Sequence, residues 1–214
     1  MDITWYGQAC FKIKGKSTTV VIDPFDQDYT GLKLPKDLEA QVALVTHQHK
    51  DHNNTQAVSG NPLVITGPGE YEKAGVSITG VAAFHDSKQG EEKGRVTLYH
   101  ISVDGVNIVH LGDLGHVLTE EQTSEIDNVD ILMIPVGGVV TTDSEAAAKV
   151  VAQLEPKIVI PMHYKIPGLK FEELEEVRAF LKEMGAENIS EQPKLSITKD
   201  KLPEETTVVL LSKS

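Results

Sequence analysis

A dense group of potential metal ligands follows one strand-like run. The run Gln41–Thr46 leads directly into His47-Gln48-His49-Lys50-Asp51-His52. Because side chains alternate along an extended chain, we expect the first two histidines of this group on the same side. The aspartate and the third histidine fall where the chain can turn into a helix over His52–Ser59. Imidazole and carboxylate suit zinc, iron or manganese, whereas the lack of thiolates argues against a soft-metal site. The alternative is a solvated polar loop that happens to contain histidines.

The first half of the chain reads as a series of short strands. Alternating or apolar runs are separated by Gly, Lys/Ser and Asp-Pro punctuation. The predicted strands are Asp2–Tyr6, Cys10–Ile13, Thr18–Ile22, Gln41–Thr46, Val76–Phe84, Val96–Val103 and Val106–His110. The last two flank Asp104-Gly105, a dipeptide that favours a tight hairpin turn.

The second half alternates strands and helices. Its predicted elements are strands over Ile131–Pro135, Lys157–Pro161 and Thr206–Leu211 and helices over Asp143–Leu154 and Phe171–Met184. Strands followed by strand–helix units predict an α/β (α+β) fold with two sheets face to face and helices outside. A length of 214 residues allows one large domain or two small ones. No linker or repeat divides the chain, so we predict a single domain over residues 1–214.

Charge and cysteine content exclude several classes of protein. The net charge of −12 repels phosphate backbones and disfavours nucleic-acid binding. No apolar run approaches the roughly 20 residues that span a bilayer, and the N-terminus lacks a basic region followed by an apolar one. The single cysteine, Cys10, cannot form an internal disulfide, so we expect a cytoplasmic protein. The sequence leaves a homo-oligomer open.

The pattern of histidines and aspartates resembles that of the metallo-β-lactamase-fold hydrolases. Their signature is His-x-His-x-Asp-His at a strand end, followed by a histidine, an aspartate after a glycine, and a late histidine. The matching residues downstream are His85, Asp113 and His163. The segments Trp5-Tyr6-Gly7-Gln8-Ala9-Cys10-Phe11 and Pro161-Met162-His163-Tyr164 look most like the small branch of ascorbate-6-phosphate lactonase-like proteins. That branch usually has His where this chain has Gln8.

The resemblance implies a four-layer αββα sandwich with two mixed sheets, and it implies a ligand set. One metal ion would take His47, His49 and His85, a second would take Asp51, His52 and His163, and Asp113 would bridge the two. The implied cofactors are two divalent metal ions, with zinc preferred and manganese or iron as alternatives. Spacing alone does not give this partition.

The remaining histidines have less specific interpretations. We assign two residues to the catalytic group, Asp51, which is also a ligand, and His116. His116 is included because it follows Asp113 through a glycine-containing turn. There it can face the cleft as a substrate contact or proton donor, with a surface loop histidine as the alternative. His110 lies three residues before Asp113 on one strand, so the two should point to opposite faces. We therefore expect His110, like His100, to be a packed histidine.

The expected activity is metal-dependent hydrolysis. Two divalent ions outweigh the charge of their carboxylate ligands, so the site attracts an anion even in an acidic chain. A hydroxide held by the two ions would cleave a small anionic substrate, such as a lactone, ester, amide or phosphodiester. The chain has no room for an inserted nuclease domain. The alternatives are an iron-dependent redox enzyme on the same fold and a non-catalytic metal-binding protein.

Overall fold

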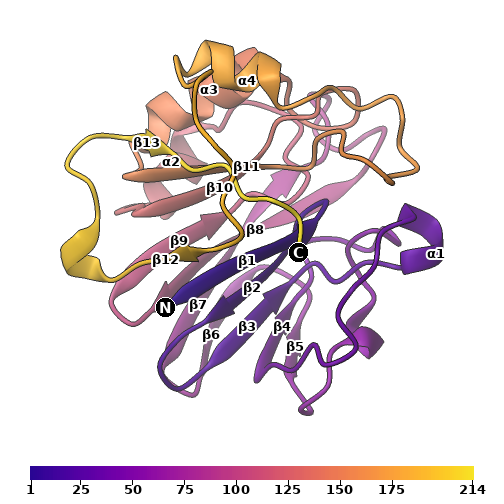
Figure 1. Cartoon of the computed structure of the whole chain (residues 1–214), viewed down its shortest axis with the longest axis vertical. Helices are drawn as coiled ribbons and strands as arrows, with labels where there is room; N and C mark the ends of the chain where they lie inside the picture. The colour runs from indigo at the N-terminus through magenta and orange to yellow at the C-terminus, as the bar shows by residue number, and fades with distance from the viewer.

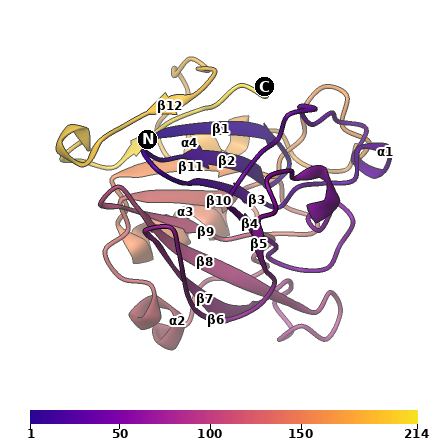
Figure 2. The same ribbon diagram turned by 90° about the horizontal axis from the view of Figure 1, so that it is seen from below.

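Two mixed β-sheets packed face to face form the centre of the computed structural model, which describes residues 1–214 (Figures 1 and 2). The first sheet has the strand order β12 (Leu195–Ser196), β1 (Asp2–Gly7), β2 (Cys10–Lys14), β3 (Thr19–Ile22), β4 (Val42–Leu44) and β5 (Leu63–Ile65). The second sheet has the order β13 (Thr207–Val208), β11 (Ile158–Met162), β10 (Ile131–Pro135), β9 (Val106–His110), β8 (Arg95–Val103), β7 (Val76–Phe84) and β6 (Gly69–Lys73). Each sheet combines parallel and antiparallel neighbours.

The two sheets share one hydrophobic core. Alternation places Ile3 and Trp5 of β1 on the face that meets the second sheet, and both are buried. Strands β10 and β11 are buried along their whole length, as expected for central parallel strands that are covered on both faces. A single cluster of 48 buried apolar residues draws on both sheets. Burial of this shared core therefore fixes the register of the strands that carry the site.

Few helices cover the outer faces. They are α1 (Gln27–Thr30), α2 (Glu120–Glu125), α3 (Ser144–Leu154) and α4 (Arg178–Glu183), with 3₁₀ turns at Thr55–Ala57 and Lys199–Lys201. Helix α3 packs on β10, α4 packs on α3, and α2 lies against β7. On the first sheet, the loop that carries Phe25 and Leu38 buries the outer face. The αββα arrangement is confirmed, although loop and the short α1 make up most of one outer layer. None of these helices has the length and hydropathy required to cross a bilayer.

The predicted helix over Phe171–Met184 was wrong in its first half, because only α4 is helical. The backbone of Glu175 bonds elsewhere: its N–H donates to Gly137 O (2.9 Å), and its carbonyl accepts from Lys165 N (2.8 Å). These long-range bonds hold residues 165–176 as a loop. The side chains of Phe171 and Leu174, which fitted the helical spacing, line a cavity instead.

Three other segments also differ from expectation. The predicted helix over His52–Ser59 is reduced to the 3₁₀ turn, because Asn54 N donates to Pro24 O (2.7 Å) rather than within a helix. The predicted strand over Thr206–Leu211 is only β13 and an isolated bridge at Leu211. Strand β6 is not among the strands expected from the sequence, and it forms an exposed edge strand paired with β7.

Candidate metal centre and cavity

The carboxyl ends of several strands meet at one edge of the sandwich. In the first sheet, β3 and β4 are parallel and lead into Asp23 and the segment Thr46–His52. In the second sheet, β9, β10 and β11 are parallel, and β7 runs the same way as β9 because each is antiparallel to β8. His85, Asp113 and His163 follow β7, β9 and β11. Parallel strand ends thus bring side chains far apart in sequence to one edge.

The seven ligands expected from the sequence form two adjoining groups. Within each group, one potential ligand atom per residue lies within 4.8 Å of the others. The first group is His47, His49 and His85, and the second is Asp51, His52, Asp113 and His163. All but His49 are buried. The structure therefore brings together the seven residues that the family resemblance implies, with Asp113 placed in the second group.

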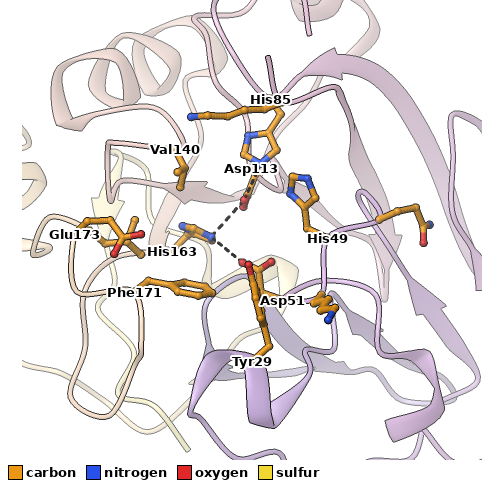
Figure 3. Close-up of a pocket in the computed structure, with 13 residues that line it drawn as sticks. Tyr29, His49, Asp51, His85, Asp113, Val140, His163, Phe171 and Glu173 are labelled. Carbon is orange, nitrogen blue, oxygen red and sulfur yellow. Dashed lines mark ion pairs between the residues drawn. The ribbon is translucent and has the colours of Figure 1, made fainter. Parts of the chain in front are cut away.

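Asp113 connects the two groups. Its Oδ2 lies 3.2 Å from His85 Nε2 in the first group, and 3.2 Å from His52 Nε2 and 3.3 Å from His163 Nε2 in the second. Figure 3 shows the contacts of Asp113 with His85 and His163. This carboxylate therefore occupies the position that a shared ligand requires.

The crowding of these groups shifts their protonation. Burial, and then the neighbouring His52, lower the pKa of His47 to about 2, so His47 is neutral, as a metal ligand must be. Burial also opposes the charged form of His52, but Asp113, Asp51 and Asp23 outweigh it and raise the pKa of His52 well above its usual value. In Asp51 burial is again outweighed, by His52 and by the hydrogen bond with His163, and the pKa is lowered. The site therefore favours cationic charge beside its carboxylates.

Asp23 holds the first sheet's loop in place. It follows β3 and accepts hydrogen bonds from Thr46 N (2.8 Å) and Thr46 Oγ1 (2.7 Å), and its Oδ2 lies 2.9 Å from His52 Nδ1. This contact leaves Nε2 of His52 to face the other ligands. Gly112 lets the second sheet come close here, because a Cβ at this residue would lie 2.8 Å from Thr46 Cβ.

Gln8 is a part of the site that sequence reasoning did not place. Its Nε2 lies 3.3 Å from Asp51 Oδ2 and 3.1 Å from His163 Nε2, and its side chain is buried. The backbone carbonyl of Gln8 accepts hydrogen bonds from Trp5 Nε1 (2.9 Å) and from His163 N (3.1 Å). Gln8, Asp23 and His163 all have φ near +50°, which non-glycine residues adopt at an energetic cost. The only signal in the sequence was the departure from His at residue 8.

The other histidines stand apart from the two groups. His110 is buried, with Nε2 2.9 Å from Ala9 O and Nδ1 accepting from Gly112 N, which agrees with its prediction as a packed residue. His100 lies within β8, outside both groups. The structure does not bring His116 to the cavity. Its ring is held by the backbone instead, because Nε2 accepts from Phe84 N (3.2 Å) and Nδ1 lies 2.8 Å from Val117 O.

A cavity of about 480 Å³ opens above the two groups. The potential ligands His49, Asp51, His85, Asp113 and His163 contribute to its lining. Tyr29, Val140, Phe171 and Leu174 add apolar surface, and Lys50, Lys93 and Glu173 add charge. In Figure 3, Tyr29 and Phe171 lie on one side of the cavity, and His49 and His85 lie on the other. A small molecule in this cavity would contact both the polar centre and the apolar side.

A sandwich of two mixed sheets with a His/Asp centre at the ends of its strands is the architecture of the metallo-β-lactamase superfamily of metal-dependent hydrolases. Comparison of the sequence supports this class directly. The family model described as the beta-lactamase superfamily domain matches residues 2–163, and the chain belongs to this superfamily of hydrolases.

Several relatives share most of the chain. A UPF0173 metal-dependent hydrolase of Thermoplasma volcanium is 35% identical over 192 residues, which cover 77% of this chain and 83% of the relative. The corresponding protein of Thermoplasma acidophilum is 33% identical over 189 residues, with the same coverage of 77% and 83%. A crystal structure from Thermotoga maritima, assigned as a Zn-dependent hydrolase of the metallo-β-lactamase superfamily, is 38% identical. It has a TM-score of 0.80 and covers 98% of this chain and 97% of its own.

Proposed function

We propose that this metal-dependent hydrolase uses two divalent ions, preferably zinc, to cleave a small anionic ester-like substrate. The substrate class comprises lactones, esters, amides and phosphodiesters. The observation that carries the proposal is the pair of adjoining ligand groups connected by Asp113 Oδ2. We assign His47, His49 and His85 to one ion and Asp51, His52 and His163 to the other, with Asp113 shared.

The residues present fit such ions. Asp113 Oδ1 and His52 Nε2 are buried and make no hydrogen bond, which is costly unless another partner satisfies them. Five imidazoles with two carboxylates and no thiolate suit zinc, with manganese or iron as alternatives. When bound, two such ions would lower the pKa of a shared water toward about 7 and so supply the attacking hydroxide.

The chain's own residues orient and attract the substrate. Asp23 fixes the ring of His52, and the donor N–H of Gln8 restrains Asp51. Lys50 and Lys93 line the cavity and place two cations beside the carboxylates of Asp51, Asp113 and Glu173. With two divalent ions bound as well, the cavity would attract an anionic substrate, although the whole chain carries −12.

We further propose that residues 1–214 act as one hydrolase domain. Residues beyond the matched region add β12 to the first sheet and β13 to the second. They also add Phe180 and Leu211 to the shared core. The one thiol, Cys10, is buried and free, which is compatible with a reducing compartment such as the cytoplasm.

The test is a metal-dependent assay followed by isotope labelling. Protein treated with a chelator is screened against lactones, thioesters and phosphodiesters before and after zinc or manganese is restored. We expect activity only with metal. A single turnover in ¹⁸O-labelled water should then place the label in the first product, because the attacking oxygen comes from solvent. A protein carboxylate as nucleophile would instead give an unlabelled first product. Activity that survives complete metal removal, or that needs oxygen, would contradict the proposal.

A further inference from the structure

An apolar wall faces the candidate metal centre across the cavity. Tyr29 of α1 and Phe171 of the loop over residues 165–176 pack edge to face, with ring centroids 5.3 Å apart and an interplanar angle of 68°. Val140 and the buried Leu174 continue this surface. Tyr29 is 45% exposed, and Phe171 is only partly buried. The protein therefore leaves aromatic surface uncovered beside its polar centre.

The wall is built before any ligand arrives. Asp26 Oδ1 accepts from Asp28 N (2.9 Å) and Tyr29 N (3.2 Å), which fixes the start of α1. The loop of Phe171 is tied to this helix, because Lys170 N donates to Thr30 O (2.9 Å) and Lys170 Nζ donates to Asp28 O (2.6 Å). The two aromatic rings thus come from segments that hydrogen bonds already join. The entropic cost of ordering these segments on ligand binding is therefore small.

The loop of Phe171 is also tied to the strand ends that carry the centre. The bond from Glu175 N to Gly137 O connects it to the turn after β10. A Cβ at Gly137 would overlap the carbonyl oxygen of His163, so this turn lies directly against a candidate ligand. The apolar wall therefore has a fixed position relative to His163. Figure 3 shows Phe171 and His163 among the residues that line the cavity.

We propose that Tyr29 and Phe171 determine specificity by binding an apolar, ring-sized group of the substrate while its cleavable polar group faces the His/Asp centre. Within the anionic substrates proposed above, the class is thus an ester, lactone or amide of a carboxylic acid that carries an apolar group, rather than of a short polar one. This inference rests on the proposed hydrolytic function and deepens it. The cavity of about 480 Å³ is large enough for one such small molecule.

Binding of simple carboxylates tests the wall without requiring turnover. Dissociation constants of acetate and phenylacetate are measured by calorimetry on the zinc-loaded full chain. We expect phenylacetate to bind at least about tenfold more tightly, because burial of a ring removes apolar surface from water. Phe171→Ala and Tyr29→Ala should reduce this ratio to less than about threefold, while the dissociation constant of acetate stays unchanged.

Tyr71→Ala is the matched control, because Tyr71 lies on the edge strand β6 and does not line this cavity. It should keep the full ratio. Thermal melting and zinc content establish that each variant is folded and loaded. If Phe171→Ala does not fold, the exposed Tyr29 still gives a variant that tests the wall.

Two results would overturn the inference. One is equal binding of the two carboxylates to the unmodified protein, or binding of neither. The other is a preference for phenylacetate that survives both substitutions. A tenfold preference for phenylacetate in a protein that hydrolyses no substrate of the panel would support the binding role of Tyr29 and Phe171 and contradict the proposed hydrolytic function. Hydrolysis without this preference would support the hydrolytic function and contradict the binding role.

Discussion

Asp23 Oδ2 lies 2.9 Å from His52 Nδ1, and neither side chain is exposed to solvent. The two residues follow neighbouring parallel strands, β3 and β4, whose carboxyl ends share an edge. A carboxylate on the far nitrogen of a metal-binding histidine fixes the tautomer and the ring orientation. We therefore interpret Asp23 as the residue that orients His52.

Asp23→Asn should weaken metal binding about 10–100-fold, because the amide no longer holds the ring of His52 as a charged acceptor. Competition with a chelator of known affinity measures this loss. Asp130→Asn is the control, because Asp130 is also a buried aspartate but pairs with Lys199. It should lower stability and leave metal affinity unchanged. Equal affinity in the Asp23 variant and the unmodified protein would contradict the assigned role.

Gln8→Ala should weaken binding of one of the two ions by about tenfold, because it removes the donor that restrains Asp51. An ion held by the first group should keep its affinity, since the candidate ligands that the Gln8 side chain contacts, Asp51 and His163, both belong to the second. A cobalt titration followed by absorbance separates the two binding steps. Two unchanged steps would show that Gln8 only fills space.

Asp113→Ala should remove or displace at least one ion, because Asp113 contacts both groups. His110→Ala should leave metal content unchanged, since its ring bonds to the backbone of Ala9 and Gly112 and lies outside both ligand groups. The cost of this second change should instead be about 2–4 kcal/mol of stability through lost packing. Elemental analysis and denaturant unfolding of the two variants measure both effects. Equal metal loss in the two would overturn the distinction.

Asp86→Asn should release the loop after β7. The carboxylate of Asp86 accepts from the backbone N–H groups of Lys88, Gly90, Glu92 and Lys93. Burial opposes its charge, but these four donors outweigh burial and lower its pKa to about 2. The protection of these four amides against exchange, taken relative to their intrinsic exchange rate at each pH, should therefore be high at pH 4 and be lost as the pH falls toward 2.

In the Asn variant the protection of these amides should be low at every pH, since an amide group cannot accept all four bonds. Asp127→Asn, at an exposed aspartate on another loop, serves as the control. Slow exchange in the Asp86 variant would show that the loop does not depend on this carboxylate.

Local chemistry was sufficient for much of the fold. The tight turn at Asp104-Gly105 is confirmed, with both residues at positive φ between β8 and β9. The helix expected over Asp143–Leu154 is confirmed as α3, which Asp143 caps by accepting from Ala146 N. Alternating and apolar runs gave the central strands to within a few residues. Each of these features depends on neighbours in sequence, which a periodic pattern records.

The sequence by itself also indicated potential metal ligands in His47, His49, Asp51 and His52, because imidazole and carboxylate side chains at this spacing serve few other purposes, and the family resemblance added His85, Asp113 and His163. Only the tertiary structure decided how they combine with the rest of the site. Phe171 fits a helical pattern, but the bond from Glu175 to Gly137 turns its segment into a cavity wall. His116 lies near Asp113 in sequence, but the backbone of Phe84 holds its ring. These outcomes depend on contacts between residues far apart in the chain, and no local pattern encodes them.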